Sequence, residues 1–99
     1  MFRSTINKGF QITFDNGNTV SVQWGPGNYC APTHPKGRSA PHNAPMSTDF
    51  WESKTAEVAA WNEDGDWHRF EHDSVDGYLS PAEVATFIDF VANNELKTE

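Results

Sequence analysis

Three residues with metal-ligating side chains follow one another closely in the middle of this chain: Cys30, His34 and His42. Their spacing matches none of the usual zinc signatures, and a fourth ligand would have to come from His68 or His72. A zinc site is therefore poorly supported, and we predict no metal site and no cofactor.

The pair Cys30 and His34 could also be interpreted as a nucleophile and its base. One loop supplies both residues, however, and no motif for an oxyanion hole accompanies them. A small buried cysteine at the end of a strand is the favoured interpretation. With no other catalytic signature, we expect a protein that is not an enzyme, with a metal- or cysteine-dependent hydrolase as the third-ranked alternative.

Residues 72–83 resemble a calcium loop of the EF-hand type, with Asp76, Gly77 and Glu83 at its fifth, sixth and twelfth positions. His72 occupies the first position, where the ion needs a carboxylate. Glu83 is also explained by helix capping. We therefore expect a structural turn, with Gly77 as its turn residue.

These candidates must be positioned by a hairpin that we predict over residues 9–24. Apolar residues alternate with polar ones along both of its strands, so each strand has one face to bury. A three-residue loop, Asp15 to Gly17, pairs Ile12 with Val20 and keeps the apolar faces together. A two-residue loop would mix the faces, so we predict the longer loop.

A second hairpin is predicted over residues 55–70, with strands Thr55–Trp61 and Trp67–Phe70. The loop 63–65 again ends in glycine and sets Trp61 opposite Trp67, an aromatic cross-strand pair. Two hairpins give a meander of about four strands.

The C-terminal part predicts a helix over residues 81–93. Ser80 and Glu83 form a capping box, and proline stands at the first helical position. One apolar stripe follows at helical spacing: Val84, Phe87, Ile88 and Val91. The fold class is α+β, a small antiparallel sheet with this amphipathic helix packed on it, in one domain over residues 1–99.

Residues 25–54 form a long loop between the hairpins, rich in proline, glycine, serine, asparagine and histidine. Compact domains rarely carry such a loop without a role. A binding loop and an insertion without a role both remain open.

The charge balance limits the possible partners. Fourteen acidic residues against seven basic ones give a net charge of −7, which argues against binding of duplex nucleic acid through its phosphates. An acidic surface can mimic nucleic acid to a basic partner, or simply serve solubility. No apolar run is long enough to cross a bilayer, no secretory signal is recognisable, and a single cysteine fits a reducing compartment. We expect a cytoplasmic protein.

Several stretches together resemble a family of small uncharacterised phage and prophage proteins: residues 9–14, Asn16-Gly17, residues 20–24, Gly27-Asn28-Tyr29-Cys30, residues 55–61 and residues 77–81. The resemblance covers most of the chain. It implies a viral accessory role inside a bacterial host cell, and it supplies no reaction and no site residues.

Two binding functions follow for such a protein. In the first, it inhibits a host protein, such as a defence component, through its acidic surface or long loop. In the second, arginines and aromatic residues, which include Trp24, enclose a host signalling nucleotide. The predicted contact residues are Asn28, Tyr29, Cys30, Arg38, Trp51, Trp61, Trp67 and Arg69. Because a chain of this length buries only a small core, which pairing would complete, we also expect a homodimer.

Overall fold

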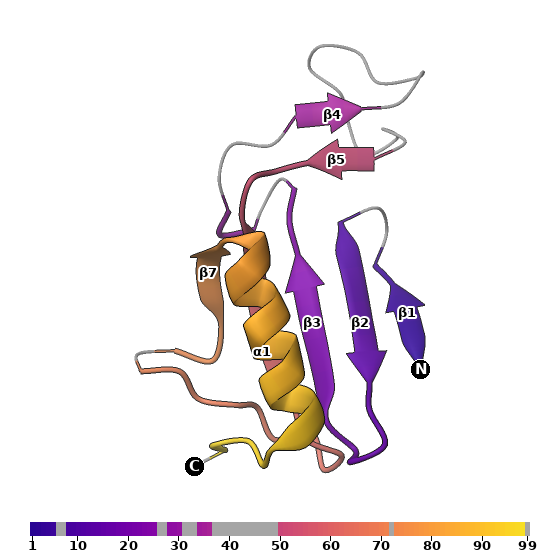
Figure 1. Cartoon of the computed structure of the whole chain (residues 1–99), viewed down its shortest axis with the longest axis vertical. Helices are drawn as coiled ribbons and strands as arrows, with labels where there is room; N and C mark the ends of the chain where they lie inside the picture. Colours follow the sequence, from indigo (N-terminus) through magenta and orange to yellow (C-terminus); the bar gives the residue numbers. More distant parts are fainter. Residues whose placement is uncertain (6–7, 26–27, 31–33, 37–49, 72, 99) are drawn as a thin grey trace.

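A computed structural model of the chain describes residues 1–5, 8–25, 28–30, 34–36, 50–71 and 73–98, and only the backbone of residues 34–36, 50 and 51. Five antiparallel strands form one sheet in the order β1-β2-β3-β6-β7. Helix α1 lies across one face of it (Figure 1). The strands are β1 (Phe2–Ser4), β2 (Gly9–Thr13), β3 (Thr19–Gln23), β6 (Ala56–Trp61) and β7 (Asp76–Leu79), and the helix is α1 (Pro81–Asn93).

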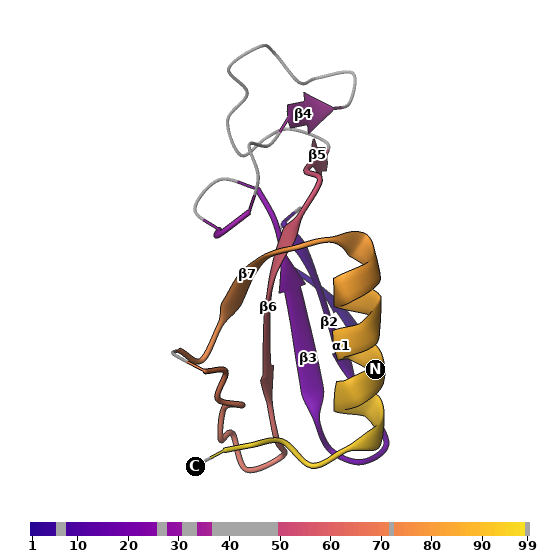
Figure 2. The ribbon, with the colours of Figure 1, turned by 60° about the vertical axis from the view of Figure 1, so that its left-hand side comes forward.

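The predicted α+β class is confirmed, and the predicted long loop contains two short strands. These are β4 (His34–Lys36) and β5 (Phe50–Glu52), which pair with each other as a separate ribbon. The ribbon lies beyond the end of the main sheet (Figure 2). The sheet and its helix therefore form one unit, and the ribbon extends from the link between β3 and β6.

The first hairpin has the predicted register. Ile12 lies opposite Val20, and the Phe14 N–H donates to the Asn18 carbonyl at 2.9 Å, which closes a three-residue loop. Gly17 takes φ 90°, a left-handed conformation that glycine adopts without a Cβ penalty. The apolar alternation thus fixes the register through the turn.

The prediction of the second hairpin is correct at the turn but wrong for the second strand. Asn62 and Asp66 close the loop and Trp61 pairs with Trp67, as predicted. The His68 N–H still donates to the Ala60 carbonyl at 2.8 Å, but the chain then leaves β6, and residues 68–70 form no strand. They contact the C-terminal tail instead: the Arg69 N–H donates to the Lys97 carbonyl at 2.7 Å, and the Lys97 N–H donates to Nδ1 of His68 at 3.1 Å.

The outer neighbour of β6 is β7, so the turn predicted at Gly77 is also wrong. Ala56 pairs with Leu79 and Val58 with Asp76, which leaves one extra residue in β7. Tyr78 lies within this bulge at φ 61°, a conformation that is rare for a bulky side chain. Asp76 and Gly77 therefore belong to an edge strand.

The core lies between the sheet and the predicted stripe of α1. Val20, Val58 and Val91 are fully buried, while Val84 and Ile88 are half-buried. The capping box is confirmed, because the Glu83 N–H donates to Ser80 Oγ at 3.2 Å and the Ser80 N–H donates to Glu83 Oε1 at 2.9 Å. Local signals in the sequence thus place the helix start correctly.

The other end of α1 is held by the first hairpin. The Asn18 side-chain amide donates to the carbonyls of Val91 and Asn94 at 3.0 and 2.8 Å. Asn16 donates to the carbonyls of Val91 and Ala92, each at 3.1 Å. These amides satisfy carbonyls that have no partner within a helix.

Candidate functional site

The face of the sheet opposite α1 is its polar face, and it carries a small hollow of about 140 Å³. Because neighbours on a strand point to opposite sides, Ser21, Gln23 and Glu57 face away from the core while the valines between them face the helix. Trp67 and Val75 wall the hollow on the side of the chain that follows β6. Polar side chains thus share the lining of the hollow with Val58 and Ala59, and the Trp67 side chain forms one wall.

Glu57 is the ionisable group in this hollow. It lies on β6 opposite Gln23 and is half-buried. Burial raises the pKa of its carboxyl above the ordinary value, the Tyr29 backbone N–H opposes this by hydrogen bonding, and the Asp73 carboxylate raises the pKa further. A carboxylate kept in such a place is a candidate for function.

Tyr29 is held at the rim by its backbone. Its N–H bonds Glu57, and its carbonyl accepts the Tyr78 N–H at 2.9 Å. Gly77 permits this approach, because a Cβ there would lie 2.5 Å from the Tyr29 Cβ. Tyr29 and Tyr78 are 60% and 61% exposed, so both phenol rings remain open to solvent.

Trp61 and Trp67 extend the aromatic surface toward the other end of β6. Their ring centroids are 5.0 Å apart, with the planes tilted by 35°. Trp67 is 44% exposed although it packs on Trp61 and borders the hollow. Exposed tryptophan supported by a second ring is typical of contact surfaces.

The predicted contact residues are only partly brought together. Tyr29, Trp61 and Trp67 belong to the polar face and its rim. Asn28 instead supports its turn, with its amide donating to the Trp24 carbonyl at 3.0 Å, and Cys30 is half-buried with Sγ 3.8 Å from the Gly25 carbonyl. Arg69 is exposed beside the C-terminal tail, whereas Arg38 and the side chain of Trp51 lie outside what the structure describes.

Three contributors were not predicted: Glu57, Asp73 and Tyr78. Glu57 carries a signal in the sequence, because it alternates with Ala56 and Val58 and must face away from the core. Asp73 and Tyr78 carry none, since their position depends on the pairing of β7 with β6.

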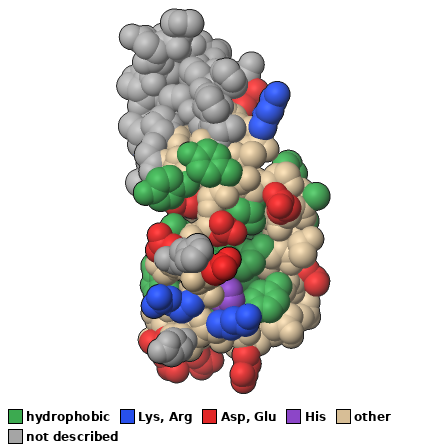
Figure 3. Space-filling model, turned by 90° about the vertical axis from the view of Figure 1, so that its left-hand side faces the viewer, with side chains coloured by type: hydrophobic (Ala, Val, Ile, Leu, Met, Phe, Trp, Pro, Cys, Tyr) green, Lys and Arg blue, Asp and Glu red, His purple; other side chains and the backbone are tan. Residues whose placement is uncertain are grey.

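Two carboxylates of this face lie close together, because the charge of Asp73 raises the pKa of the Glu57 carboxyl. Arg3 lies on the same face but on β1, with its guanidinium bonded to Gln11 Oε1 at 3.2 Å, so β2, β3 and β6 separate it from Arg69. Figure 3 shows the β7 side of the molecule, where hydrophobic, acidic and basic side chains lie close together.

Within the described ranges, no three histidine, cysteine, aspartate or glutamate side chains gather where they could hold a metal ion. His42 and His72 fall outside those ranges, as does the side chain of His34. Residues 72–83 also do not form a calcium loop, because residues 76–79 belong to strand β7.

No helix in the described part of the chain is long and apolar enough to cross a membrane. Comparison with family models, with curated proteins and with solved structures finds no match to this chain. The proposals below therefore rest on the geometry of the polar face.

Proposed function

We infer that this protein acts by binding, and that its polar face takes a basic segment of a partner protein. The supporting observation is that the half-buried Glu57 and the exposed Trp67 line the same hollow. A lysine or arginine side chain fits both groups at once, because its charge pairs with the carboxylate and its face or ammonium group packs on the indole.

Net charge supports the same partner. At −7 the protein attracts a positively charged surface over a distance set by the ionic strength. The rim tyrosines, Tyr29 and Tyr78, supply large contact area at little cost in side-chain entropy. A basic partner would thus be steered toward the protein by charge and held by aromatic contacts.

The resemblance to phage proteins suggests the setting: a viral accessory protein in the bacterial cytoplasm that inhibits a host factor, such as a defence component with a basic nucleic-acid-binding surface. Inhibition needs only occupancy of that surface. Capture of a signalling nucleotide has weaker support, because Arg3 and Arg69 lie at opposite sides of the sheet and the hollow between them holds a carboxylate.

Affinity capture from bacterial cells that express the tagged protein tests this function. Wild type is compared with the double variant Glu57→Gln and Trp67→Ala, and with Asp15→Asn as a control of matched charge on the exposed turn after β2. We expect a basic protein to be retained by wild type and by the control, and lost with the double variant. Equal recovery by all three would overturn the proposal.

A further inference from the structure

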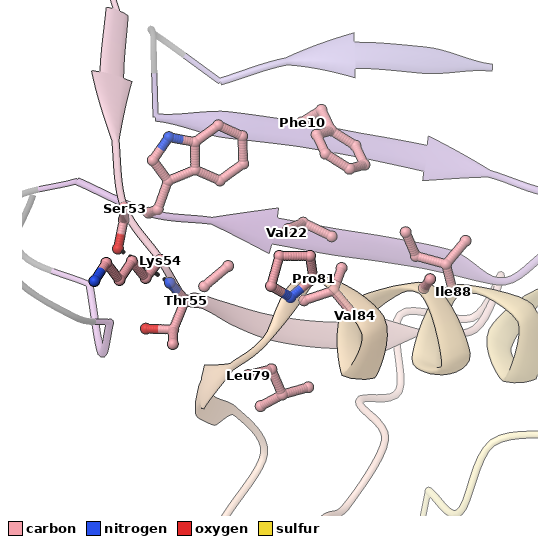
Figure 4. Close-up of a pocket in the computed structure, with 12 residues that line it drawn as sticks. Phe10, Val22, Ser53, Lys54, Thr55, Leu79, Pro81, Val84 and Ile88 are labelled. Carbon is pink, nitrogen blue, oxygen red and sulfur yellow. Dashed lines mark hydrogen bonds between the residues drawn. The ribbon is translucent and has the colours of Figure 1, made fainter. Parts of the chain in front are cut away.

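A second hollow lies on the other face of the sheet, between the first half of α1 and the end of β3. Its volume is about 310 Å³. Figure 4 shows Pro81, Val84 and Ile88 on the helix side of this hollow and Phe10 and Val22 on the sheet side. Trp24 and Leu79 complete the apolar wall. It is separate from the polar face, because the sheet lies between the two.

The hollow exists because the two ends of α1 are held differently. At the C-terminal end, Val91 is fully buried and its carbonyl is bound by Asn18. Toward the N-terminal end, Val84 and Ile88 are only half-buried, and the residues facing them include the small side chains of Ala56 and Val22. The helix is thus packed tightly at one end and leaves apolar surface open at the other.

The chemistry of the rim is different from that of the walls. Ser53, Lys54 and Thr55 lie together at one end of the hollow (Figure 4). Lys54 is exposed and is the only charged residue among the described residues that line the hollow. In a protein of net charge −7, Lys54 supplies one positive charge at the outer end of the hollow, with its side chain directed away from Val84 and Ile88 (Figure 4).

We propose that this hollow binds a small amphipathic carboxylate, with its apolar body between α1 and the sheet and its carboxylate beside Lys54. The volume is about twice that of an engineered apolar cavity of about 150 Å³ that takes up benzene, so a body of roughly eight to twelve carbon atoms fits. Filling the hollow adds contacts to apolar walls that otherwise face solvent. This site is independent of the proposed partner at the polar face.

Calorimetric titration with decanoate tests the proposal, with decanol and decylammonium as probes of the same length. We expect decanoate to bind one site per chain, and decylammonium to bind more weakly by at least about fivefold because its charge repels Lys54. Lys54→Gln is expected to weaken decanoate by roughly two- to fivefold and to leave decanol unchanged, as for one exposed ion pair.

Two variants fill the hollow in different ways. Val84→Phe places a ring inside it, and Ala85→Leu extends the exposed rim with little risk to folding. Both should abolish binding of all three probes, whereas Thr86→Leu on the outward face of α1 should not. Decanoate that binds equally well to the filled variants, or no better than decylammonium, would overturn the proposal.

A second copy of the chain is the competing occupant, since a homodimer was expected from the sequence. Sedimentation of the ligand-free protein decides this. A monomer agrees with the proposal. A dimer that Ala85→Leu dissociates would contradict it, because the hollow would then be an interface between copies.

Discussion

The side-chain amide of Asn18 donates to the carbonyl of Val91 at 3.0 Å and joins residues 73 positions apart. Asn18 is 6% exposed, so its replacement removes two hydrogen bonds from the end of α1, while Asn16 remains as a donor to the Val91 carbonyl. We predict that Asn18→Ala lowers the free energy of unfolding by about 2 kcal/mol, and that Asn16→Ala, on the exposed turn, lowers it by about 0.5–1 kcal/mol. Denaturant unfolding measures both.

Asn93→Ala is the control for this prediction, because the Asn93 amide bonds only Asp89 within the same helix. Asn93→Ala should lower the free energy of unfolding by less than Asn18→Ala does. If all three variants lose the same stability, the hairpin does not hold the end of α1 in the way described.

A second prediction concerns Gly77, whose missing side chain lets Tyr29 approach β7. A methyl group there would lie 2.5 Å from the Tyr29 Cβ and 2.7 Å from the Tyr29 carbonyl oxygen. Gly77→Ala should therefore displace this loop, cost about 1–3 kcal/mol of stability and speed hydrogen exchange of the Tyr78 N–H. Unchanged exchange at Tyr78 would show that the loop does not rest on Gly77.

The raised pKa of Glu57 predicts the sign of a stability change. Because the folded state favours the protonated carboxyl, the stability that Glu57 contributes is present below its unfolded pKa and is lost as pH rises through the folded pKa. Glu57→Gln keeps an acceptor for the Tyr29 N–H and removes the charge. It should raise the melting temperature at pH 7 relative to wild type, and the gain should shrink toward pH 4.

Glu95→Gln, an exposed site on the C-terminal tail, makes the same charge change. The rise in melting temperature should be smaller for Glu95→Gln than for Glu57→Gln, and it should depend less on pH. A Glu57→Gln protein that is less stable than wild type at pH 7 would mean that the ionised carboxylate supports the fold.

His68 predicts a pH dependence of the opposite sign. It is 6% exposed among Phe70, Phe87 and Phe90. Burial, and then the charge of Lys97, lower its pKa below the ordinary 6.5. The neutral ring is favoured in the folded state, so its contribution is complete above pH 6.5 and decreases as pH falls toward the folded pKa.

His68→Gln removes this titration. We expect wild type to be the more stable protein at pH 7.5 and its advantage to narrow by pH 5, as measured by thermal unfolding across that range. A difference between the two proteins that stays constant with pH would rule out the titration of His68 as its cause.

The features that sequence reasoning predicted correctly depend on neighbours in the chain. The loop ending at Gly17, the pairing of Trp61 with Trp67 and the capping box at Ser80 each lie within a few residues. Strand β1 has only three residues and pairs with the adjacent β2, whereas strand β7 depends on a distant partner, β6. Asp76-Gly77 carries turn-forming residues, and only pairing with β6 makes it a strand.

The candidate site divides in the same way. Tyr29 and Trp67 were predicted from their types, because exposed aromatic residues near turns often make contacts. Their meeting with Glu57 could not be predicted, since it needs both the register of β6 and the bulge at Tyr78. Asn28 and Cys30 were grouped with them by position in the chain, but both bond to the backbone of their own turn.

The most direct test of the central claim is an NMR titration of the isotope-labelled protein with a short capped peptide of alternating arginine and glycine. We predict shifts confined to Tyr29, Glu57, Trp67 and Val75, affinity reduced roughly tenfold in Trp67→Ala, and reduced binding in Glu57→Gln although that variant is more stable. The control peptide has glutamate in place of arginine and should give no shifts. Equal binding of both peptides, or shifts that map to α1, would contradict the account.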